Sequence, residues 1–165
     1  MTTQAHTACL LLGSNIQPEK NLALGVALLR QKFSLIRLSS VWETCPVGSD
    51  GPDFLNLAVL ISTPLEAGEL KEKLLRSLEA QLGRVRRVDK NAPRPIDIDI
   101  VIFDGMLFDS SLWRYVHRAV PVAEILPDYL SSQGDCLKVV ASRLAKMTPI
   151  RLRSDVQIDG KLNAS

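Results

Sequence analysis

The chain has 165 residues, a length typical of one domain, and we expect residues 1–165 to form a single folded unit. Hydrophobic residues make up 46% of the sequence and charged residues 23%, which is ordinary for a globular protein. The formal net charge of +2 is too small to indicate binding to nucleic acid or to an anionic membrane.

The cysteines and the apolar segments favour a cytoplasmic protein. Cys9, Cys45 and Cys136 are widely spaced and form no CxxC motif, so neither a disulfide framework nor a zinc site is expected. No stretch approaches the ~20 consecutive apolar residues of a membrane span, and the first residues include no basic leader. We therefore expect a cytoplasmic chain that binds neither nucleic acid nor membrane.

The apolar pattern of the first half predicts a strand, a helix and two further strands, over residues 7–13, 17–33, 34–44 and 54–63. Pro18 is a typical early helical residue, and Leu22, Val26 and Leu29 follow at helical spacing. The third strand is apolar at nearly every position, which is typical of a central strand covered on both faces.

The second half predicts a long helix over residues 64–83 and a strand over residues 96–103. One helix face carries five leucines, and Gly83 is a typical end signal; the leucines are Leu70, Leu74, Leu75, Leu78 and Leu82. The order strand, helix, strand, strand, helix, strand is that of ferredoxin-like α+β domains. We expect a βαββαβ core with helices packed on an antiparallel sheet. An irregular C-terminal extension follows, with helical patterns over residues 120–126 and 135–147 and one short strand.

Two acids stand inside the predicted strand 96–103. Asp97 and Asp99 are two residues apart, so their carboxylates project from one face, while Ile96, Ile98 and Ile100 take the other. Adjacent carboxylates repel unless a cation offsets their charge, and Mg²⁺ typically combines one or two carboxylates with phosphate oxygens and water. From alternation alone, a solvated strand face whose acids pair with arginines is the more common explanation.

The arginines upstream of this strand favour a phosphate site. Arg94 lies between two prolines, so its backbone is stiff, and guanidinium groups bind phosphate oxygens in bidentate fashion. For Arg86, Arg87 and Lys90 a solvated basic loop is the simpler explanation. The sequence contains no GxxxxGK[ST] motif, which excludes a P-loop enzyme.

Asn56 is an amide within an otherwise apolar strand. If buried it needs hydrogen-bond partners, and it can bind the donor–acceptor edge of a heterocycle. Phe54, two residues earlier, shares its face and offers a ring for stacking. His117, taken alone, is more often a surface or core residue than a catalytic one.

Six segments of the chain form a specific combination: LGSN (12–15), VWETCPVG (41–48), PDFLNLAV (52–59), LEAQLGRVR (78–86), APRPIDIDIVIF (92–103) and VH (116–117). The chain resembles the 6-hydroxymethyl-7,8-dihydropterin pyrophosphokinase family, in which these segments occur in the same order at similar spacing. The pairing of LGRxR with PRxxDxDI is the most specific part of the resemblance.

The resemblance implies a ferredoxin-like fold and transfer of pyrophosphate from ATP to the hydroxymethyl group of a reduced pterin, a step of folate biosynthesis that releases AMP. ATP would be the co-substrate, and two Mg²⁺ ions would be held by Asp97, Asp99 and the ATP phosphates. The partners would be small-molecule substrates, and we expect a monomer.

The resemblance also assigns roles to individual residues. The implied catalytic residues are Arg84, Arg94, Asp97 and Asp99. The implied nucleotide-binding residues are Glu79, Arg84, Arg94, Ile100 and His117. The implied pterin-binding residues are Thr44, Val47, Phe54, Asn56 and Asp97. No covalent nucleophile is required, because such transfers depend on alignment and charge stabilisation.

The chain departs from the family in the loops that cover the substrates. Asn91 and Ala92 stand where the family has an aromatic residue and a glycine, Val116 replaces a proline, and the segment after His117 is shortened. That segment lacks the family's covering arginine and aromatic residue. The candidates to replace them are Arg114, Tyr115 and Arg118.

Two alternatives belong to other functional classes. A non-catalytic or slow paralogue would bind nucleotide or pterin as a regulatory module, and an assay for AMP release separates it from an enzyme. An RNA-binding ferredoxin-like domain would need exposed aromatic residues on its central strands, whereas these strands offer acids and aliphatics.

Overall fold

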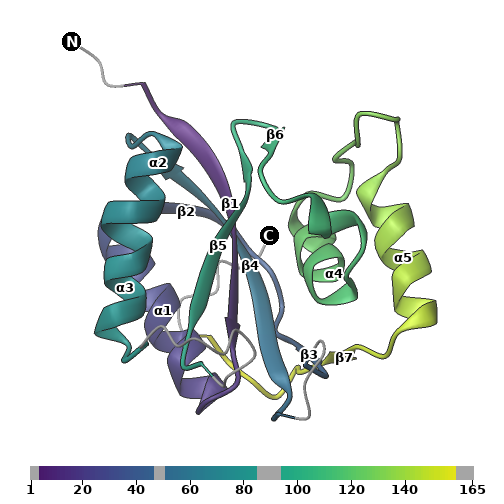
Figure 1. Cartoon of the computed structure of the whole chain (residues 1–165), viewed down its shortest axis with the longest axis horizontal. Coiled ribbons are helices and arrows are strands. Elements are labelled where there is room, and N and C mark those ends of the chain that lie inside the picture. The colour runs from purple at the N-terminus through teal and green to yellow at the C-terminus, as the bar shows by residue number, and fades with distance from the viewer. Residues whose placement is uncertain (1–3, 47–50, 85–93, 159–165) are drawn as a thin grey trace.

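An antiparallel sheet forms the central layer of the protein in a computed structural model that describes residues 4–46, 51–84 and 94–158 (Figure 1). Its strands are β1 (His6–Ser14), β2 (Ser34–Leu38), β3 (Trp42–Thr44), β4 (Phe54–Thr63), β5 (Asp97–Phe103), β6 (Met106–Leu107) and β7 (Arg151–Leu152). Their order is β6-β5-β1-β4-β3-β7, and β2 pairs with the half of β4 that β3 does not contact. β1 therefore lies between β4 and β5: all of β1 pairs with β4, and its residues Ala8 to Gly13 also pair with β5, with a register shift between Cys9 and Leu10.

The predicted βαββαβ core is confirmed, with strand order β5-β1-β4-β2. The strand predicted over residues 34–44 is divided into β2 and β3, and Ser39 stands at the division. The N–H of Ser39 donates to the carbonyl of Ala58 (2.9 Å), while its Oγ accepts from the N–H of Ala58 (2.8 Å). Because a side chain replaces the main chain in this pairing, the regular ladder stops there.

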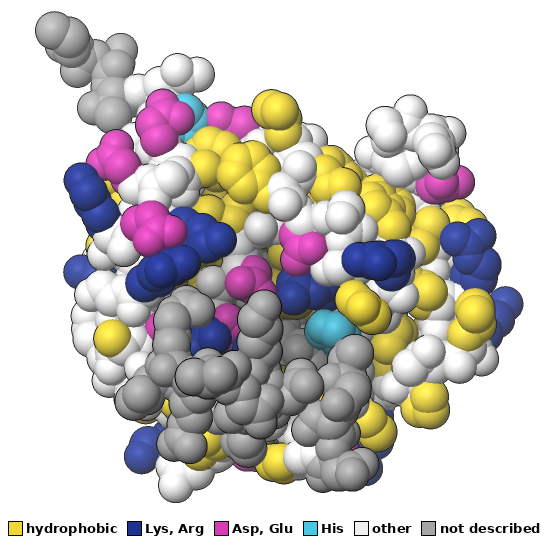
Figure 2. All heavy atoms as spheres, viewed as in Figure 1, with side chains coloured by type: hydrophobic (Ala, Val, Ile, Leu, Met, Phe, Trp, Pro, Cys, Tyr) yellow, Lys and Arg dark blue, Asp and Glu magenta, His cyan; other side chains and the backbone are white. Residues whose placement is uncertain are grey.

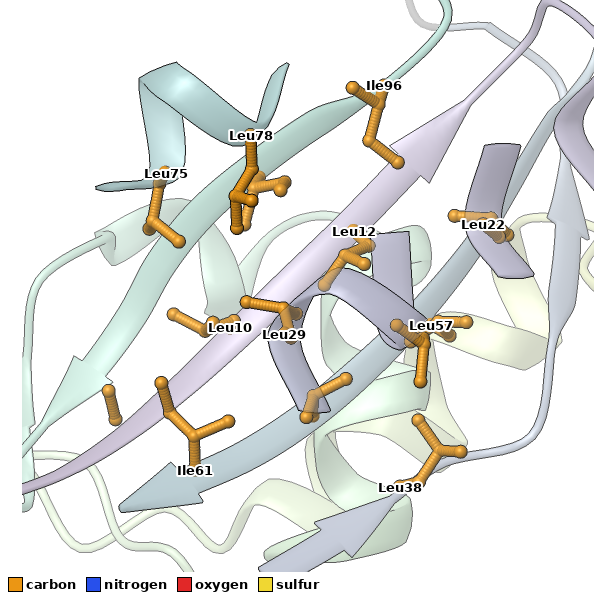
Figure 3. Packing of buried hydrophobic residues seen from close by; sticks show 14 of the residues in the cluster. Leu10, Leu12, Leu22, Leu29, Leu38, Leu57, Ile61, Leu75, Leu78 and Ile96 are labelled. Carbon is orange, nitrogen blue, oxygen red and sulfur yellow. The ribbon is translucent and has the colours of Figure 1, made fainter. Parts of the chain in front are cut away.

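Helices cover both faces of the sheet, which gives three layers (Figure 1). On one face lie α1 (Pro18–Lys32) and a continuous helical segment made of α2 (Ala67–Glu69), the π-helix η1 (Leu70–Leu75) and α3 (Arg76–Gln81). Leu22 and Leu29 of α1, with Leu75 and Leu78, pack on the leucines of β1 and β4 (Figure 3). The predicted long helix is confirmed; its last helical residue is Gln81, and Gly83, whose φ of 91° suits glycine, follows the C-cap Leu82.

The C-terminal third is more regular than predicted and forms the layer on the other face. It consists of the 3₁₀ helix η2 (Ser110–Trp113), α4 (Val116–Ile125) and α5 (Leu137–Met147). α4 begins before its apolar pattern indicates, because the carbonyl of Tyr115 accepts the N–H of Ala119 (2.9 Å). Leu112, Val122 and Leu137 pack on the sheet face opposite α1. In the described part of the chain, no helix is both long and apolar enough to cross a bilayer.

Candidate active site

A cavity of about 240 Å³ lies between the sheet and the first turn of α4. Residues of β1, β3, β4, β5 and α4 line it, so segments from both halves of the chain contribute. Figure 2 shows acidic, basic and histidine side chains gathered near the middle of this face, between β5 and α4. The predicted site residues on its wall are Thr44, Phe54, Asn56, Arg94, Asp97, Asp99 and His117.

One row of residues across three strands connects the two ends of the cavity. Gly13 on β1 lies opposite Asn56 on β4 and opposite Asp97 on β5. Neighbouring strands are about 4.8 Å apart, so the backbones of Asn56 and Asp97 are separated by about 10 Å. A β-carbon at Gly13 would lie 3.2 Å from Oδ1 of Asn56. Because Gly13 has no side chain, the floor of the cavity stays open between the amide and the carboxylate.

Asn56 and its neighbours form one end of the cavity. Asn56 is 3% exposed, and its Nδ2 donates to Oγ1 of Thr44 at 3.0 Å, which orients the amide. Phe54 pairs in register with Thr44 and stands two residues from Asn56, so its ring lies on the same sheet face. This end therefore combines an oriented amide with an aromatic ring. Val47, also predicted for this end, lies outside the described residues.

Asp97 and Asp99 form the other end, and they differ in how readily they ionise. Oδ1 of Asp97 lies 2.5 Å from Nη1 of Arg84, and Oδ2 lies 3.3 Å from Nη1 of Arg94. Burial opposes ionisation of Asp97, but Arg84 and then Arg94 outweigh it, so the pKa of Asp97 lies below its usual value. Burial and the neighbouring Asp97 charge raise the pKa of Asp99, and Arg118 offsets this only in part. A further cation near Asp99 would oppose this rise and stabilise the two neighbouring carboxylates.

Glu79 and Arg84 support the acids from behind the cavity. Glu79 is 3% exposed, and its Oε2 accepts hydrogen bonds from Nη1 of Arg84 (3.0 Å) and from the N–H of Ile98 (2.9 Å). Arg84 also donates to the carbonyl of Ile96 (3.3 Å). Neither Glu79 nor Arg84 is among the described residues on the cavity wall. In this arrangement Glu79 orients Arg84 and β5, and any direct contact of Glu79 with a nucleotide stays a prediction.

Ile100 does not present its side chain to the cavity. That side chain belongs to the core cluster on the opposite face of the sheet, so the predicted nucleotide contact is not a side-chain contact. The main chain of Ile100 is placed differently. The N–H of Ile98 points away from β1, toward Glu79, and backbone groups alternate along an antiparallel strand. The N–H and C=O of Ile100 therefore face the same outer edge of β5.

His117 lies on the cavity wall in the first turn of α4. Its ring stacks on Tyr115 with centroids 5.6 Å apart, and the guanidinium of Arg114 lies 5.5 Å from the centre of the Tyr115 ring. Burial and, to a lesser extent, the charge of Arg118 lower the pKa of His117 to about 4. The imidazole is therefore neutral at pH 7 and offers one hydrogen-bond donor and one acceptor, not a positive charge.

The acids fit a hard divalent cation whose remaining ligands come from elsewhere. Asp97 and Asp99 project from one strand face into the cavity and supply carboxylate oxygens. Within the described ranges, no group of three or more His, Cys, Asp or Glu side chains is placed to hold a metal ion. Mg²⁺ suits such a partial donor set, because it retains water and takes phosphate oxygens as further ligands.

Comparison with known protein families agrees with this geometry. A family model described as 7,8-dihydro-6-hydroxymethylpterin-pyrophosphokinase (HPPK) matches residues 9–127, a range that contains every residue of the cavity wall named above. The chain belongs to the HPPK family. Helix α5 and strand β7 lie beyond the matched residues, so the site falls entirely within the HPPK region.

Two bacterial relatives carry the name 2-amino-4-hydroxy-6-hydroxymethyldihydropteridine pyrophosphokinase. The Bacillus subtilis protein is 45% identical over 103 residues, which cover 60% of this chain and 60% of the relative. The Methylorubrum extorquens protein is 34% identical over 154 residues, which cover 86% of this chain and 94% of the relative. The chain thus spans under two-thirds of the first relative and nearly all of the second.

Solved structures of HPPK-DHPS from Plasmodium falciparum share the fold. The wild-type protein with pteroate has a TM-score of 0.69 and 12% sequence identity, and the match covers 88% of this chain and 43% of that one. At this identity the likeness concerns the fold alone. It agrees with the predicted α+β architecture of an HPPK domain.

Some wall residues are not predicted by the sequence patterns, namely Gly13, Cys45, Pro46 and Ser111. The first three belong to the LGSN and VWETCPVG segments, so membership of a family motif is the signal that marks them. Ser111 belongs to none of these motifs. It reaches the cavity wall as part of η2, which follows β5 in the chain. Of the three candidates for the covering residues, Tyr115 and Arg118 line the cavity. Asn91 and Ala92 lie outside the described residues.

Proposed function

We propose that the protein transfers pyrophosphate from ATP to 6-hydroxymethyl-7,8-dihydropterin, forming AMP and the pterin diphosphate. The observation that carries the proposal is the row Asn56, Gly13, Asp97, which joins an amide and aromatic pocket to a pair of carboxylates within one cavity. Membership of the HPPK family and the names of the bacterial relatives support the same reaction.

The Asn56 end suits the pterin ring. The amide held by Thr44 can pair with the donor–acceptor edge of the heterocycle, and Phe54 offers a stacking face. A buried polar group left without a partner costs about 1–3 kcal/mol, so this end disfavours ligands that lack such an edge. With the ring at Asn56, the hydroxymethyl group extends over Gly13 toward Asp97.

The Asp97 end suits the phosphate chain. The hydroxymethyl oxygen forms a bond to the β-phosphorus while the bond from that phosphorus to the α–β bridging oxygen breaks. AMP leaves with the bridging oxygen, and the proton of the hydroxyl group passes to solvent. Arg94 on the wall and Arg84 behind it stabilise negative charge on the phosphates. Asp97 and Asp99 would hold Mg²⁺, for which we propose two ions, and the bound metal would supply charge neutralisation for the phosphates.

The adenosine part of ATP is proposed to lie along α4 and the outer edge of β5. The neutral imidazole of His117 can exchange hydrogen bonds with the nucleotide without adding charge. The main-chain N–H and C=O of Ile100 offer a donor and an acceptor to the edge of a base. These contacts explain why Ile100 can matter although its side chain is in the core.

Measurement of AMP release tests the proposed reaction. The protein with ATP, Mg²⁺ and the hydroxymethyl pterin is expected to release AMP, and omission of the pterin or chelation of Mg²⁺ to stop it. Asp97→Asn and Asp99→Asn are expected to lower kcat by about a thousandfold or more, since each removes a carboxylate from the metal site. The control is Asp128→Asn, whose carboxylate is 84% exposed in a surface pair with Lys138 and whose loss should leave kcat unchanged.

Two results would contradict the proposal in different ways. A protein that binds ATP or the pterin but releases no AMP would instead be a non-catalytic regulatory module. Wild-type turnover in Asp97→Asn or Asp99→Asn, with circular dichroism showing a folded protein, would remove the metal assignment while leaving the reaction in place.

A further inference from the structure

Arg118 occupies a position in the site that the proposed reaction does not by itself explain. It lies in the first turn of α4, lines the cavity, and its side chain is 18% exposed. Its guanidinium stands between carboxylates of two other segments. Nη2 is 3.4 Å from Oδ2 of Asp99 on β5, and Nη1 is 2.8 Å from Oδ2 of Asp109, which caps η2.

The two carboxylates hold Arg118 unequally. Asp109 is itself fixed, because its Oδ1 accepts hydrogen bonds from the N–H (3.0 Å) and the hydroxyl (2.6 Å) of Ser111. Nη1 of Arg118 forms a close ion pair with Asp109 but has no hydrogen-bond partner among the described residues, whereas Nη2 donates a long hydrogen bond (3.4 Å) to Asp99. Because Asp109 is fixed and lies closer to the guanidinium, its ion pair is the anchor, and the long Asp99 hydrogen bond is the contact that a competing cation can replace.

Both carboxylates at this end of the cavity have cationic neighbours. Asp97 pairs with Arg84 and Arg94, and Asp99 forms an ion pair with Arg118. Fully ionised ATP with two divalent cations has a net charge close to zero. Its phosphates and cations therefore bind by replacing ion pairs that already exist in the site. A divalent cation that binds Asp99 displaces a guanidinium, and the phosphate chain offers that guanidinium a new anion.

We propose that Arg118 serves in turn as a stand-in cation and as a phosphate ligand. With no metal bound it neutralises Asp99. When a divalent cation takes Asp99, Arg118 stays anchored on Asp109 and donates through its released Nη2 to the phosphates of the nucleotide. This role rests on the proposed function, because it assumes that Asp97 and Asp99 hold the metal and that a nucleotide brings the phosphates.

The proposal predicts opposite effects of one substitution on two affinities. In Arg118→Gln, Asp99 loses its positive neighbour, so Mn²⁺ added without nucleotide should bind roughly tenfold more tightly than to the wild type. The same variant should bind a non-hydrolysable ATP analogue with Mg²⁺ roughly tenfold more weakly, because a charge-assisted hydrogen bond is lost. Electron paramagnetic resonance of free Mn²⁺ measures the first affinity, and isothermal titration calorimetry measures the second.

A second variant separates the charge of Arg118 from its geometry. Arg118→Lys keeps a positive charge near Asp99 but loses the fork that spans Asp99 and Asp109. Its Mn²⁺ affinity should stay within about threefold of the wild type, while its nucleotide affinity should fall as in Arg118→Gln. Arg143→Gln on the exposed face of α5 is the control, and both affinities should be unchanged.

Each other result decides against the proposal. Unchanged or weaker Mn²⁺ binding in Arg118→Gln would show that Arg118 does not occupy the cation position, and a fall of both affinities together would assign it a structural role. If Arg118→Gln gives either of these results and still releases AMP, the proposed function stands and only the proposed role of Arg118 is contradicted. If neither the wild type nor Arg118→Gln binds Mn²⁺, both the metal assignment to Asp97 and Asp99 and the proposed role of Arg118 are contradicted.

Discussion

Gly13 shows how one residue without a side chain determines the shape of the site. From Ala8 to Leu12, β1 is apolar and buried, and its leucines fill the core on both faces of the sheet. At Gly13 the same strand passes between Asn56 and Asp97, where any side chain would project into the cavity or against its wall. The open floor at Gly13 is therefore needed for one substrate to reach both ends.

Substitution of Gly13 by Ala tests this role at the residue scale. The new β-carbon would lie 3.2 Å from Oδ1 of Asn56 and would push the amide out of position. We expect the KM for the pterin to rise about tenfold and the KM for ATP to stay within about twofold, as measured by steady-state kinetics. Gly68→Ala on α2 is the matched control, because nothing lies within 4 Å of its added carbon. Equal rises in both KM values would show that the perturbation is not confined to the pterin end.

At the scale of elements, the π-helix η1 sets which residues of the long helix face the sheet. Leu70 and Glu79 are nine residues apart, about two and a half turns of a regular α-helix, and would point to opposite sides. Both are nevertheless buried, at 0% and 3% exposure. The wider turns of η1 absorb the difference in phase, so one continuous helical segment buries Leu70 and also brings Glu79 to Arg84 and β5.

Glu79→Gln tests the connection between this helix and β5. The amide keeps the shape of the side chain, but Arg84 loses a charged partner in a nearly buried site. We expect the free energy of unfolding to fall by about 1–3 kcal/mol and the KM for ATP to rise, as measured by urea denaturation and kinetics. Glu69→Gln, half-exposed and paired with Lys73 at 3.9 Å, should change stability by about 0.5 kcal/mol or less. A loss of stability with unchanged kinetics would limit Glu79 to a structural role.

At the scale of the whole molecule, β1 is anchored at the end opposite to the site. Nδ1 of His6 lies 2.6 Å from Oδ2 of Asp104, just after β5, and the N–H of Thr7 donates to the other oxygen of Asp104 (2.9 Å). Nε2 of His6 lies 3.4 Å from Glu66, just before α2. One end of the β1–β5 pair thus carries the site, and the other joins the sheet to the first helical layer.

This anchor predicts a pH dependence of stability. The hydrogen bond with Asp104 raises the pKa of His6 and lowers the pKa of Asp104. The stabilisation from His6 is thus complete below its ordinary pKa and is lost as the pH rises through its raised value in the folded protein. The stabilisation from Asp104 is lost at the other end, as the pH falls through its lowered value. Asp104→Asn should therefore flatten the decline in Tm as the pH rises above about 6.5.

Thermal melts across this range, with Asp128→Asn as the control, measure the effect. His117 does not interfere, because its pKa of about 4 changes stability only below its ordinary value near 6.5. An unaltered pH profile in Asp104→Asn would show that the pair of His6 and Asp104 does not contribute to stability in this window.

Local sequence patterns predicted the core elements and the pair of acids at one end of the cavity. The βαββαβ order, the buried strands and the acids of β5 follow from periodicity over a few residues, and the structure confirms these elements. Such patterns predicted helices near α4 and α5, but they did not predict the π-helix η1, the early start of α4 or the packing of these helices as a second layer. A change of helical phase has no signature in the spacing of leucines, and α4 begins at residues whose helical conformation depends on packing against the sheet.

The sequence by itself determined that Asp97 and Asp99 share a face, that Arg94 precedes them on a stiff backbone and that the motifs resemble one family. These properties depend on neighbours in the chain. Only the tertiary structure decided that Gly13 separates Asn56 from Asp97, that Ile100 offers its main chain, and that Arg118 reaches Asp99 and Asp109. The reason is physical: strand register and the docking of α4 join residues distant in sequence, and no local pattern encodes either.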